Sequence, residues 1–160
     1  MEQMWAPWRL EYIVGDKVEG CIFCVFPQQT NDRENRILYR GKHAFVIMNA
    51  FPYSNGHLLV APYRHTGDLS ELSADESLEM MQLVQMSIRV LKEACNPDGL
   101  NIGVNMGTAA GAGIADHVHM HIVPRWNGDT NFMPVFADVK VIPESLEKTY
   151  DKLKVIFDKQ

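Results

Sequence analysis

The sequence of 160 residues has few cysteines, no excess of positive charge and no long apolar run. Its 15 Lys and Arg residues are outnumbered by 20 Asp and Glu residues, which gives a formal net charge of -5. A general nucleic-acid-binding protein needs a basic surface to neutralise phosphates, so this composition argues against one. No apolar segment approaches the roughly 20 residues that cross a bilayer, and the N-terminus lacks the features of a signal peptide. We therefore expect a cytoplasmic protein with no nucleic-acid or membrane partner.

The cysteines are Cys21, Cys24 and Cys95, an odd number. In a reducing compartment the Cys21-x-x-Cys24 pair indicates a metal site or a redox pair rather than a structural disulfide. One such pair is a weak signal, which two further ligands elsewhere in the chain would strengthen. Cys95 closes a helical segment and is most simply a buried thiol without a role.

The chain does have a large apolar content, 46% of its residues. That content and the length suit one globular domain with a sizeable core, and we predict a single domain over residues 1–160. Trp5, Trp8, Tyr12 and Ile13 near the N-terminus have near-helical spacing and are expected to pack on this core.

Several short segments have the composition of β-strands separated by turn residues. Two of them flank Gly41-Lys42, which predicts a tight hairpin, and a third is ended by Pro62. His43 in this hairpin has no obvious partner and is most simply a solvated strand residue. The predicted strands cover residues 36–40, 43–49, 57–61, 100–106 and 117–124, with a possible short one at 138–142.

Two segments have helical periodicity. The longer covers residues 70–96, with Ser73 as its N-cap and Glu76 three residues later, as in a capping box. Its predicted core-facing residues are Leu78, Met81, Val84 (or Leu83), Ile88 and Leu91, with the methionines Met80, Met81 and Met86 as core filler. A second helix is predicted to begin at Pro143, with Glu144 in its first turn and Leu146, Tyr150, Leu153 and Ile156 on its apolar face. This order of elements predicts an α+β fold, an antiparallel sheet with helices on one face.

The most unusual segment is His117-Val-His-Met-His121-Ile-Val-Pro124. In an extended strand, its alternation directs the three imidazoles to one face and Val118, Met120 and Ile122 to the other. Neutral imidazole is a competent nucleophile toward phosphorus near pH 7, and a neighbouring imidazole can bind phosphate oxygens. The alternatives are a surface strand with incidental histidines and a purely structural metal site.

Four motifs together resemble the histidine triad, or HIT, superfamily of nucleotide hydrolases and transferases. They are the segment 117–123, Cys21-Ile-Phe-Cys24, Asn55-Gly-His-Leu-Leu-Val-Ala-Pro62 and the strand that contains Asn105. The resemblance covers most of residues 21–126, which makes residues 127–160 a C-terminal extension, and it implies a HIT-like antiparallel sheet with a long helix and a C-terminal helix. Flanking segments, Met4–Arg9, Gly111–His117 and Pro124–Pro134, look like the bacterial diadenosine polyphosphate (Ap4A) phosphorylase-like branch.

The resemblance implies roles for individual residues. His119 would be the nucleophile that attacks the α-phosphate, and His121 would bind phosphate or orient the scissile bridge. His57 would be a further catalytic residue. The alternative is that His57, which opens a buried strand, is an ordinary core residue. The implied nucleotide contacts are Ile22 and Phe23 for the base, Asn49 for the ribose, Asn105 for phosphate or the leaving group, the loop glycines Gly111 and Gly113, and Trp126 as a cover.

Ordinary alternatives stand beside several of these nucleotide contacts. Ile22 and Phe23 suit core packing equally well, Asn49 and Asn105 suit turns or strand edges, and Trp126 suits simple packing at the end of its strand. A glycine-rich loop brings backbone N–H groups close to a phosphate, but such loops are also common as simple turns.

The same resemblance completes a metal site around the cysteine pair. Cys21, Cys24, His65 and His117 would form a closed Cys2His2 set of the kind that holds structural zinc. Zinc would then anchor the cysteine pair to the histidine segment and leave His119 for chemistry. The alternative is that the thiols hold no metal.

One departure from the family pattern affects the acceptor. The family usually carries Gln followed by Ser or Thr just before the triad, where this chain has Gly113 and Ile114. Without the glutamine, a group that could orient water is missing, and room is left for a bulkier acceptor. We therefore expect inorganic phosphate to discharge the nucleotidyl-histidine and release ADP.

Three classes of function follow. The first is a nucleotidyltransferase, or phosphorylase, that cleaves diadenosine polyphosphates through a covalent nucleotidyl-histidine. The second is a HIT-type hydrolase of dinucleoside polyphosphates or nucleoside phosphoramidates, with water as acceptor. The third is a zinc-bearing nucleotide-binding module without turnover, which an intact triad disfavours. The resemblance also implies a homodimer.

Overall fold

The computed structural model describes residues 19–132 and 141–160. The predicted packing of Trp5, Trp8, Tyr12 and Ile13 and the motif Met4–Arg9 lie outside the described residues. The predicted strand at 138–142 lies mostly outside them, and its last two residues are not in a strand.

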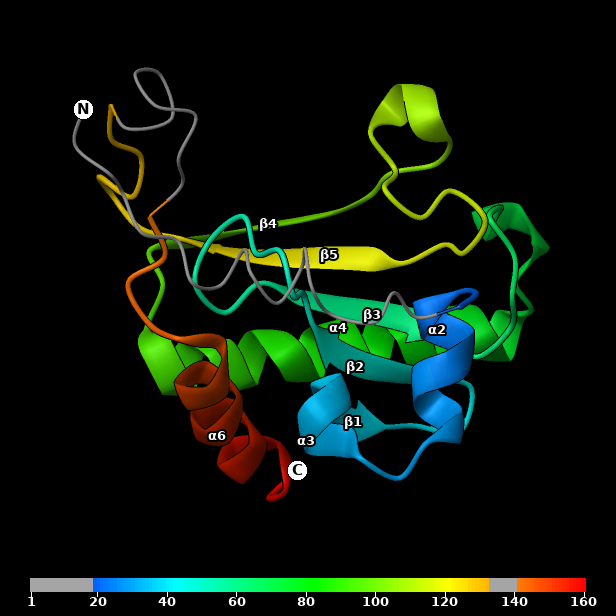
Figure 1. Ribbon diagram of the computed structural model, residues 1–160, viewed down its shortest axis with the longest axis horizontal. Coiled ribbons are helices and arrows are strands. Elements are labelled where there is room, and N and C mark those ends of the chain that lie inside the picture. Colours follow the sequence, from blue (N-terminus) through cyan, green and yellow to red (C-terminus); the bar gives the residue numbers. More distant parts are fainter. Residues whose placement is uncertain (1–18, 133–140) are drawn as a thin grey trace.

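The chain forms short helices at its start, a sheet, one long helix and a C-terminal helix (Figure 1). The strands are β1 (Ile37–Arg40), β2 (Ala44–Met48), β3 (Leu58–Pro62), β4 (Gly99–Val104) and β5 (Met120–Arg125). The α-helices are α2 (Ile22–Val25), α3 (Asp32–Asn35), α4 (Ala74–Cys95) and α6 (Leu146–Phe157). Single 3₁₀ turns cover Phe26–Gln28, Leu69–Glu71 and Thr108–Ala110.

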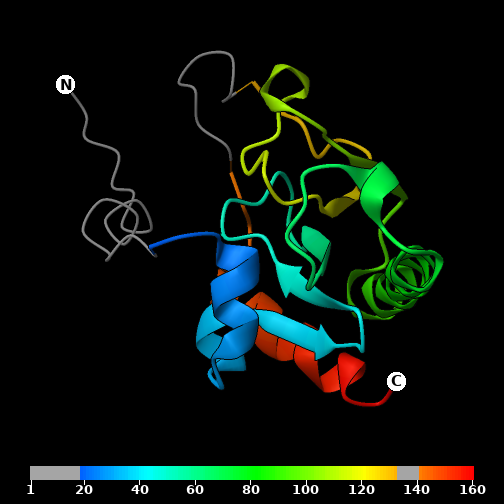
Figure 2. The same cartoon turned by 90° about the vertical axis from the view of Figure 1, so that its right-hand side faces the viewer.

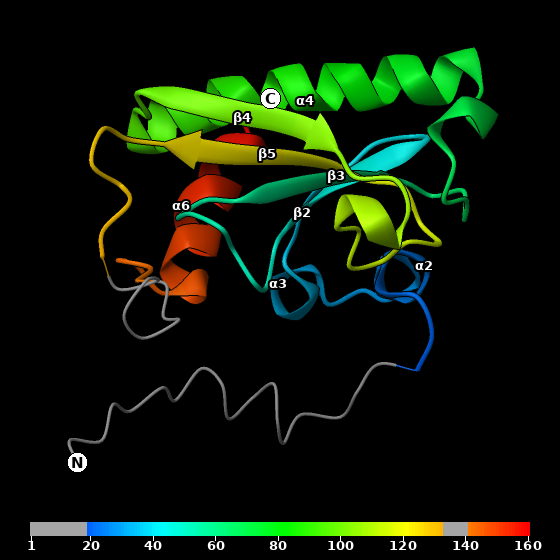
Figure 3. The ribbon, with the colours of Figure 1, turned by 90° about the horizontal axis from the view of Figure 1, so that it is seen from above.

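The five strands form one sheet in the order β1-β2-β3-β5-β4, and every neighbouring pair is antiparallel. Figure 3 shows β2, β3, β5 and β4 side by side, with α4 running along the sheet. The predicted α+β fold, an antiparallel sheet with a long helix and a C-terminal helix, is confirmed. β4 pairs with β5 from Gly99 opposite Arg125 to Val104 opposite Met120, and it forms one edge of the sheet.

The predicted hairpin between β1 and β2 is present, and a residue of α4 closes its turn. The Glu79 carboxylate accepts hydrogen bonds from the backbone N–H groups of Lys42 (2.9 Å), Ala44 (2.7 Å) and His43. Burial would raise the pKa of Glu79, but these N–H donors outweigh it and hold the pKa below its ordinary value. A side chain at Gly41 would bring its Cβ within 2.7 Å of the Ala44 carbonyl oxygen, so the turn requires glycine there.

Helix α4 begins with the predicted capping box, in which Ser73 and Glu76 each bond the other's backbone N–H. The predicted apolar face is wrong in part. Leu78 and Met81 are 59% and 46% exposed, because they lie roughly 160° and 100° around the helix from the buried Met80. The buried residues of the helix are Glu76, Met80, Leu83, Val84, Ser87, Val90 and Leu91, while Met86 and Ile88 are half-buried.

Helix α6 begins later than predicted. Its N-cap is Ser145, whose hydroxyl accepts a hydrogen bond from the Lys148 N–H, so Pro143 and Glu144 precede the helix. The predicted apolar face is otherwise present, because Tyr150, Leu153 and Ile156 are buried. The Tyr150 hydroxyl donates to the Ile37 carbonyl (3.0 Å), which attaches α6 to the edge strand β1.

The sheet has a different apolar cluster on each face. The α4-side cluster joins α4 and α6 to side chains such as Val46, Leu58 and Ile122, while the α2-side cluster joins Phe23 to Phe45 and others. Figure 2 looks along α4 and shows α4 and α2 on opposite sides of the strands. Among the described residues, no helix is long and apolar enough to cross a membrane. The long helix α4 and the C-terminal helix α6 therefore share one face as predicted, whereas the short helix α2 packs on the other face, against the expectation of helices on one face only.

Candidate functional site

The histidine segment keeps its predicted alternation, although the strand is shorter than predicted. β5 begins at Met120, so His117 and His119 precede it and only His121 lies within it. Met120 and Ile122 pack into the α4-side cluster. The rings lie on the opposite face, where the centroid of Phe23 is 5.1 Å from that of His117 and 4.8 Å from that of His119.

The backbone selects the tautomer of His119. Its Nδ1 lies 2.8 Å from the His117 carbonyl oxygen, which can only accept, so Nδ1 carries the proton. Nε2 then keeps its lone pair in the neutral ring. Burial lowers the pKa of His119, against the opposing effect of the carbonyl, and favours this neutral form. His119 is 5% exposed, and the arrangement leaves its Nε2 with the lone pair that a nucleophile needs at neutral pH.

A second chain of hydrogen bonds fixes His57 and His121. The Tyr53 N–H donates to His57 Nδ1 (3.1 Å), so the proton of a neutral His57 ring is on Nε2. His57 Nε2 lies 2.9 Å from His121 Nδ1 and donates to it. His121 therefore presents an Nε2–H donor, and burial, aided by His119, lowers its pKa to about 4. His57 is 1% exposed, so it is a buried residue that is also bonded to the triad.

The four predicted metal ligands lie together. Cys21, Cys24, His65 and His117 each direct one ligand atom into a group whose atoms all lie within 4.8 Å of one another. His117 Nδ1 is 3.3 Å and 3.6 Å from the Sγ atoms of Cys21 and Cys24, and 3.2 Å from His65 Nδ1. Cys24 Sγ is 3.3 Å from His65 Nδ1.

These distances fit a tetrahedral metal ion. Bonds of about 2.0–2.3 Å to nitrogen and sulfur put the ligand atoms of a tetrahedron roughly 3.3–3.8 Å apart. His117 Nε2 lies 2.8 Å from the Pro62 carbonyl oxygen and donates to it, which leaves Nδ1 unprotonated toward the group. The donor set and its spacing therefore suit a divalent metal that accepts two thiolates and two imidazoles.

The predicted base and ribose residues lie beside the triad in different environments. Phe23 is 1% exposed and belongs to the α2-side cluster, as the core-packing alternative predicted. Ile22 is half-buried against the same cluster. Asn49 follows β2, and its Nδ2 lies 3.3 Å from His57 Nδ1. Its Oδ1 accepts from the Phe51 N–H (2.9 Å), so this side chain also closes the turn before His57.

The loop between β4 and β5 reaches the triad. The β4–β5 ladder ends where Val104 pairs with Met120, so Asn105 is the first residue after β4 and His119 is the last residue before β5. Gly111, with a φ of 86°, and Gly113 are exposed. The loop packs closely on the segment after β3, because a Cβ at Gly67 would lie 2.4 Å from the Ala115 carbonyl oxygen.

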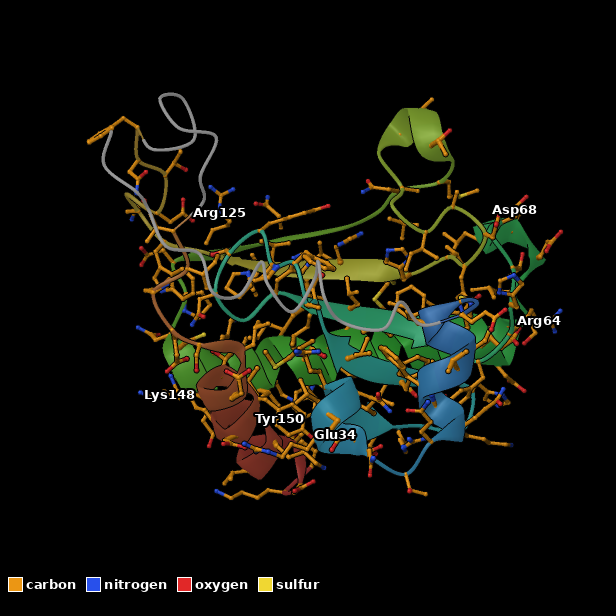
Figure 4. The ribbon with its side chains drawn as sticks, in the orientation of Figure 1. Glu34, Arg64, Asp68, Arg125, Lys148 and Tyr150 are labelled. Carbon is orange, nitrogen blue, oxygen red and sulfur yellow. The ribbon has the colours of Figure 1, made fainter. Side chains whose placement is uncertain are left out.

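Trp126 is the predicted site residue that the chain does not bring to the triad. It follows Arg125 at the C-terminal end of β5, five residues and about 17 Å of extended strand beyond His121. Figure 4 labels Arg125 near one end of the sheet and Arg64, which adjoins the metal ligand His65, near the other. Trp126 therefore lies at the opposite end of β5 from His119, and its assignment as a cover of the site stays a prediction.

The structure adds Tyr53, which the sequence did not single out. Its ring is stacked on that of His121 with centroids 5.8 Å apart and an interplanar angle of 10°, and it is 48% exposed. The available signal was an aromatic residue in the turn just before His57.

Comparison with known proteins gives the family. The family model described as the HIT domain matches residues 30–128. The AP-4-A phosphorylase of Mycobacterium tuberculosis is 39% identical over 158 residues, which cover 93% of this chain and 80% of that protein. A zinc-bound histidine triad family protein from Mycobacterium smegmatis is 27% identical, with a TM-score of 0.69 over 88% of this chain and 94% of that one. A hypothetical histidine triad nucleotide-binding protein from Sulfolobus tokodaii is 30% identical, with a TM-score of 0.67 over 87% and 90% of the two chains. The chain therefore belongs to the HIT family.

Proposed function

We propose that this protein is a nucleotidyltransferase that cleaves diadenosine polyphosphates through a covalent nucleotidyl-His119, with inorganic phosphate as the acceptor. The observation that carries the proposal is the 2.8 Å hydrogen bond from His119 Nδ1 to the His117 carbonyl, which leaves Nε2 with a lone pair. The 39% identity to the AP-4-A phosphorylase of M. tuberculosis supports the substrate class.

In the first step, His119 Nε2 attacks the α-phosphorus of one adenosine. An N–P bond forms while the bond from that phosphorus to its bridging oxygen breaks, so diadenosine tetraphosphate leaves ATP and an AMP group on His119. His121 Nε2–H is suited to donate to the phosphate oxygens, since His57 supplies the proton on its other side. Asn105 and the loop with Gly111 and Gly113 would bind the phosphates. The nucleoside would contact Ile22, Phe23 and Asn49.

In the second step, a phosphate oxygen attacks the same phosphorus, the N–P bond breaks and ADP leaves. The choice of phosphate over water rests on the residues just before the triad. Gly113 has no side chain, and Ile114 packs against the α2-side cluster, so neither position offers a polar group to orient water. A phosphate needs no such group, because it brings its own charged oxygens to the N–H donors of the loop.

We infer that the metal is zinc, held by Cys21, Cys24, His65 and His117. Two thiolates and two imidazoles at tetrahedral spacing are the donors that structural zinc prefers, and the M. smegmatis relative is zinc-bound. Zinc in a closed four-ligand site contributes cohesion rather than a reactive position. It joins the segment around α2 to the histidine segment across more than 90 residues of sequence.

The test is product analysis with diadenosine tetraphosphate in the presence and absence of inorganic phosphate. We expect equal amounts of ATP and ADP with phosphate and little turnover without it, measured by chromatography. Labelled phosphate should appear in the β-position of ADP. If ATP and AMP form at the same rate in both reactions, the protein is the alternative hydrolase and not a phosphorylase. If no products form although zinc is bound, the protein is a nucleotide-binding module without turnover.

We also propose that the protein is a cytoplasmic homodimer built on the edge strand β4. Within residues 19–132 and 141–160, β4 pairs with β5 alone, and Ile102 at its centre is 43% exposed. An unpaired strand edge with an exposed apolar residue favours pairing with a second copy about a twofold axis. The three free cysteines agree with a reducing compartment.

The dimer is tested with Ile102→Arg, which places a charge in the centre of this edge. We expect wild type to sediment as a dimer of the 18.2 kDa chain and the variant to sediment as a monomer. Leu78→Arg, at an exposed position on α4, is the matched control and should leave the mass unchanged. A monomeric wild type at micromolar concentration would contradict the proposal.

A further inference from the structure

A group of hydrogen bonds ties the start of α6 to the turn between β2 and β3. The Glu144 carboxylate accepts from Lys152 Nζ (2.8 Å), from the Thr149 hydroxyl (2.8 Å) and from Asn55 Nδ2 (3.3 Å). The Thr149 oxygen also lies 3.2 Å from Asn55 Oδ1. We call Glu144, Thr149 and Asn55 the C-terminal clamp. Figure 1 shows the segment before α6 passing beside this turn.

The clamp has the character of a built contact rather than of a surface ion pair. Thr149 is 3% exposed although its side chain is polar, so its hydroxyl needs the partners that the clamp supplies. The bond from Lys152 lowers the pKa of Glu144, and the bonds from Thr149 and Asn55 lower it further against the effect of burial. The carboxylate is therefore charged at neutral pH, and its hydrogen bonds are of the stronger, charge-assisted kind.

A single residue, Gly56, separates Asn55 from His57, and it is enclosed by its neighbours. Gly56 between them has a φ of 76° and is buried, and a Cβ there would lie 3.3 Å from Leu91 Cδ2. The turn is closed on itself by the bonds from the His57 N–H to the Ser54 carbonyl (3.2 Å) and from the Asn49 N–H to the His57 carbonyl (3.0 Å). Because these bonds close the turn around His57, we expect a shift of Asn55 to displace the His57 ring as well.

The His57 ring in turn orients His121. The 2.9 Å bond from His57 Nε2 to His121 Nδ1 leaves the donor of His121 on its Nε2, which faces the reaction in the proposed mechanism. If this bond lengthens, His121 is free to adopt the other tautomer and to turn a lone pair toward the phosphate oxygens. The hydrogen bond from His121 Nε2–H to the phosphate would then be replaced by repulsion between a nitrogen lone pair and the phosphate oxygens.

We propose that Glu144 and Thr149 are positioning residues for the transfer reaction, which hold the turn at Asn55 so that His57 keeps His121 in its donor tautomer. The inference rests on the proposed function and extends it to a part of the chain outside residues 30–128, which the HIT family model matches. Neither residue contacts the triad. Glu144 and Thr149 would act on His121 only by holding the turn at Asn55, which makes α6 important for the reaction rate.

Two variants test the proposal. Thr149→Val removes the buried hydroxyl at almost constant volume, and Glu144→Gln keeps an acceptor but removes the charge. The matched control is Asp151→Asn, which breaks the ion pair between α6 and Arg33 at a place away from the turn. We expect kcat to fall about tenfold in Thr149→Val, less in Glu144→Gln, with KM within about twofold, as for other residues that orient a reacting group. Asp151→Asn should keep kcat.

The second readout needs no substrate. In protein with ¹⁵N-labelled histidine, the His121 ring should show a single Nε2–H tautomer in wild type and Asp151→Asn, and a mixture in Thr149→Val, with His121→Asn used for assignment. An unchanged His121 spectrum in both clamp variants, or a loss of kcat no greater than in Asp151→Asn at equal melting temperature, would overturn the inference. A wild type that turns over no dinucleoside polyphosphate would overturn the proposed function instead, and the spectra would still decide the positioning role.

Discussion

His119→Ala is expected to lower the turnover of diadenosine tetraphosphate by about four orders of magnitude or more. The variant removes the only proposed nucleophile, and the remaining groups can bind the substrate but cannot form the N–P bond. His119 is only 5% exposed, so the loss of its imidazole ring should lower the stability of the fold moderately. The variant should still fold and bind metal. The rate is measured by following ATP formation at saturating phosphate.

The matched control for this substitution is His43→Ala. The contact of residue 43 with Glu79 is made by its backbone N–H, which the substitution keeps. Each protein is quenched during turnover of a substrate that is labelled in the α-phosphate. Wild type and His43→Ala should then carry label on the protein. Acid should release this label, because a phosphoramidate is acid-labile. A rate for His119→Ala within tenfold of wild type, or label retained on that variant, would rule out His119 as the nucleophile.

Cys24→Ala is expected to abolish zinc binding and to lower the melting temperature by about 10 °C or more. A metal in the proposed site would join segments that lie far apart in the chain, so we expect its loss to cost several kcal/mol, and each kcal/mol shifts the melting temperature of a domain of this size by about 2–4 °C. The measurements are metal content per chain and thermal unfolding with and without a chelator.

The effect of Cys24→Ala on chemistry should be smaller than its effect on stability. The tautomer of His119 is set by the His117 carbonyl rather than by the metal, so kcat at a temperature where the variant is folded should fall only about tenfold. Cys95→Ser is the matched control, because Cys95 bonds the Leu91 carbonyl in α4, outside the metal group. It should keep one zinc per chain, whereas full zinc occupancy in Cys24→Ala would contradict the assigned ligand set.

Local patterns in the sequence predicted the elements whose causes are local. The hairpin around Gly41, the capping box of Ser73 and the alternation of the histidines depend on neighbouring residues, and all three are present in the structure. Four metal ligands scattered over almost 100 residues came instead from family resemblance, which carries long-range information that composition and spacing lack.

The errors concern features that depend on distant partners. Leu78 and Met81 match a helical period as well as the buried residues do, and only the position of the sheet decides which side of α4 is covered. Glu144 looked like a favourable first-turn residue of α6, but the helix begins after its N-cap Ser145, and Glu144 accepts hydrogen bonds from Asn55 and Thr149 instead.

His117 serves the site through two different atoms, and this has an evolutionary consequence. Its ring faces Cys21, Cys24 and His65, the other proposed metal ligands, while its main-chain oxygen accepts a hydrogen bond from His119, the proposed nucleophile. Every amino acid has that oxygen, so we expect a descendant of this chain that replaces residue 117 to lose a proposed metal ligand and still to keep the proposed nucleophile, His119, in the same tautomer. Selection can therefore exchange the metal for other cohesive contacts without a stage at which catalysis is absent.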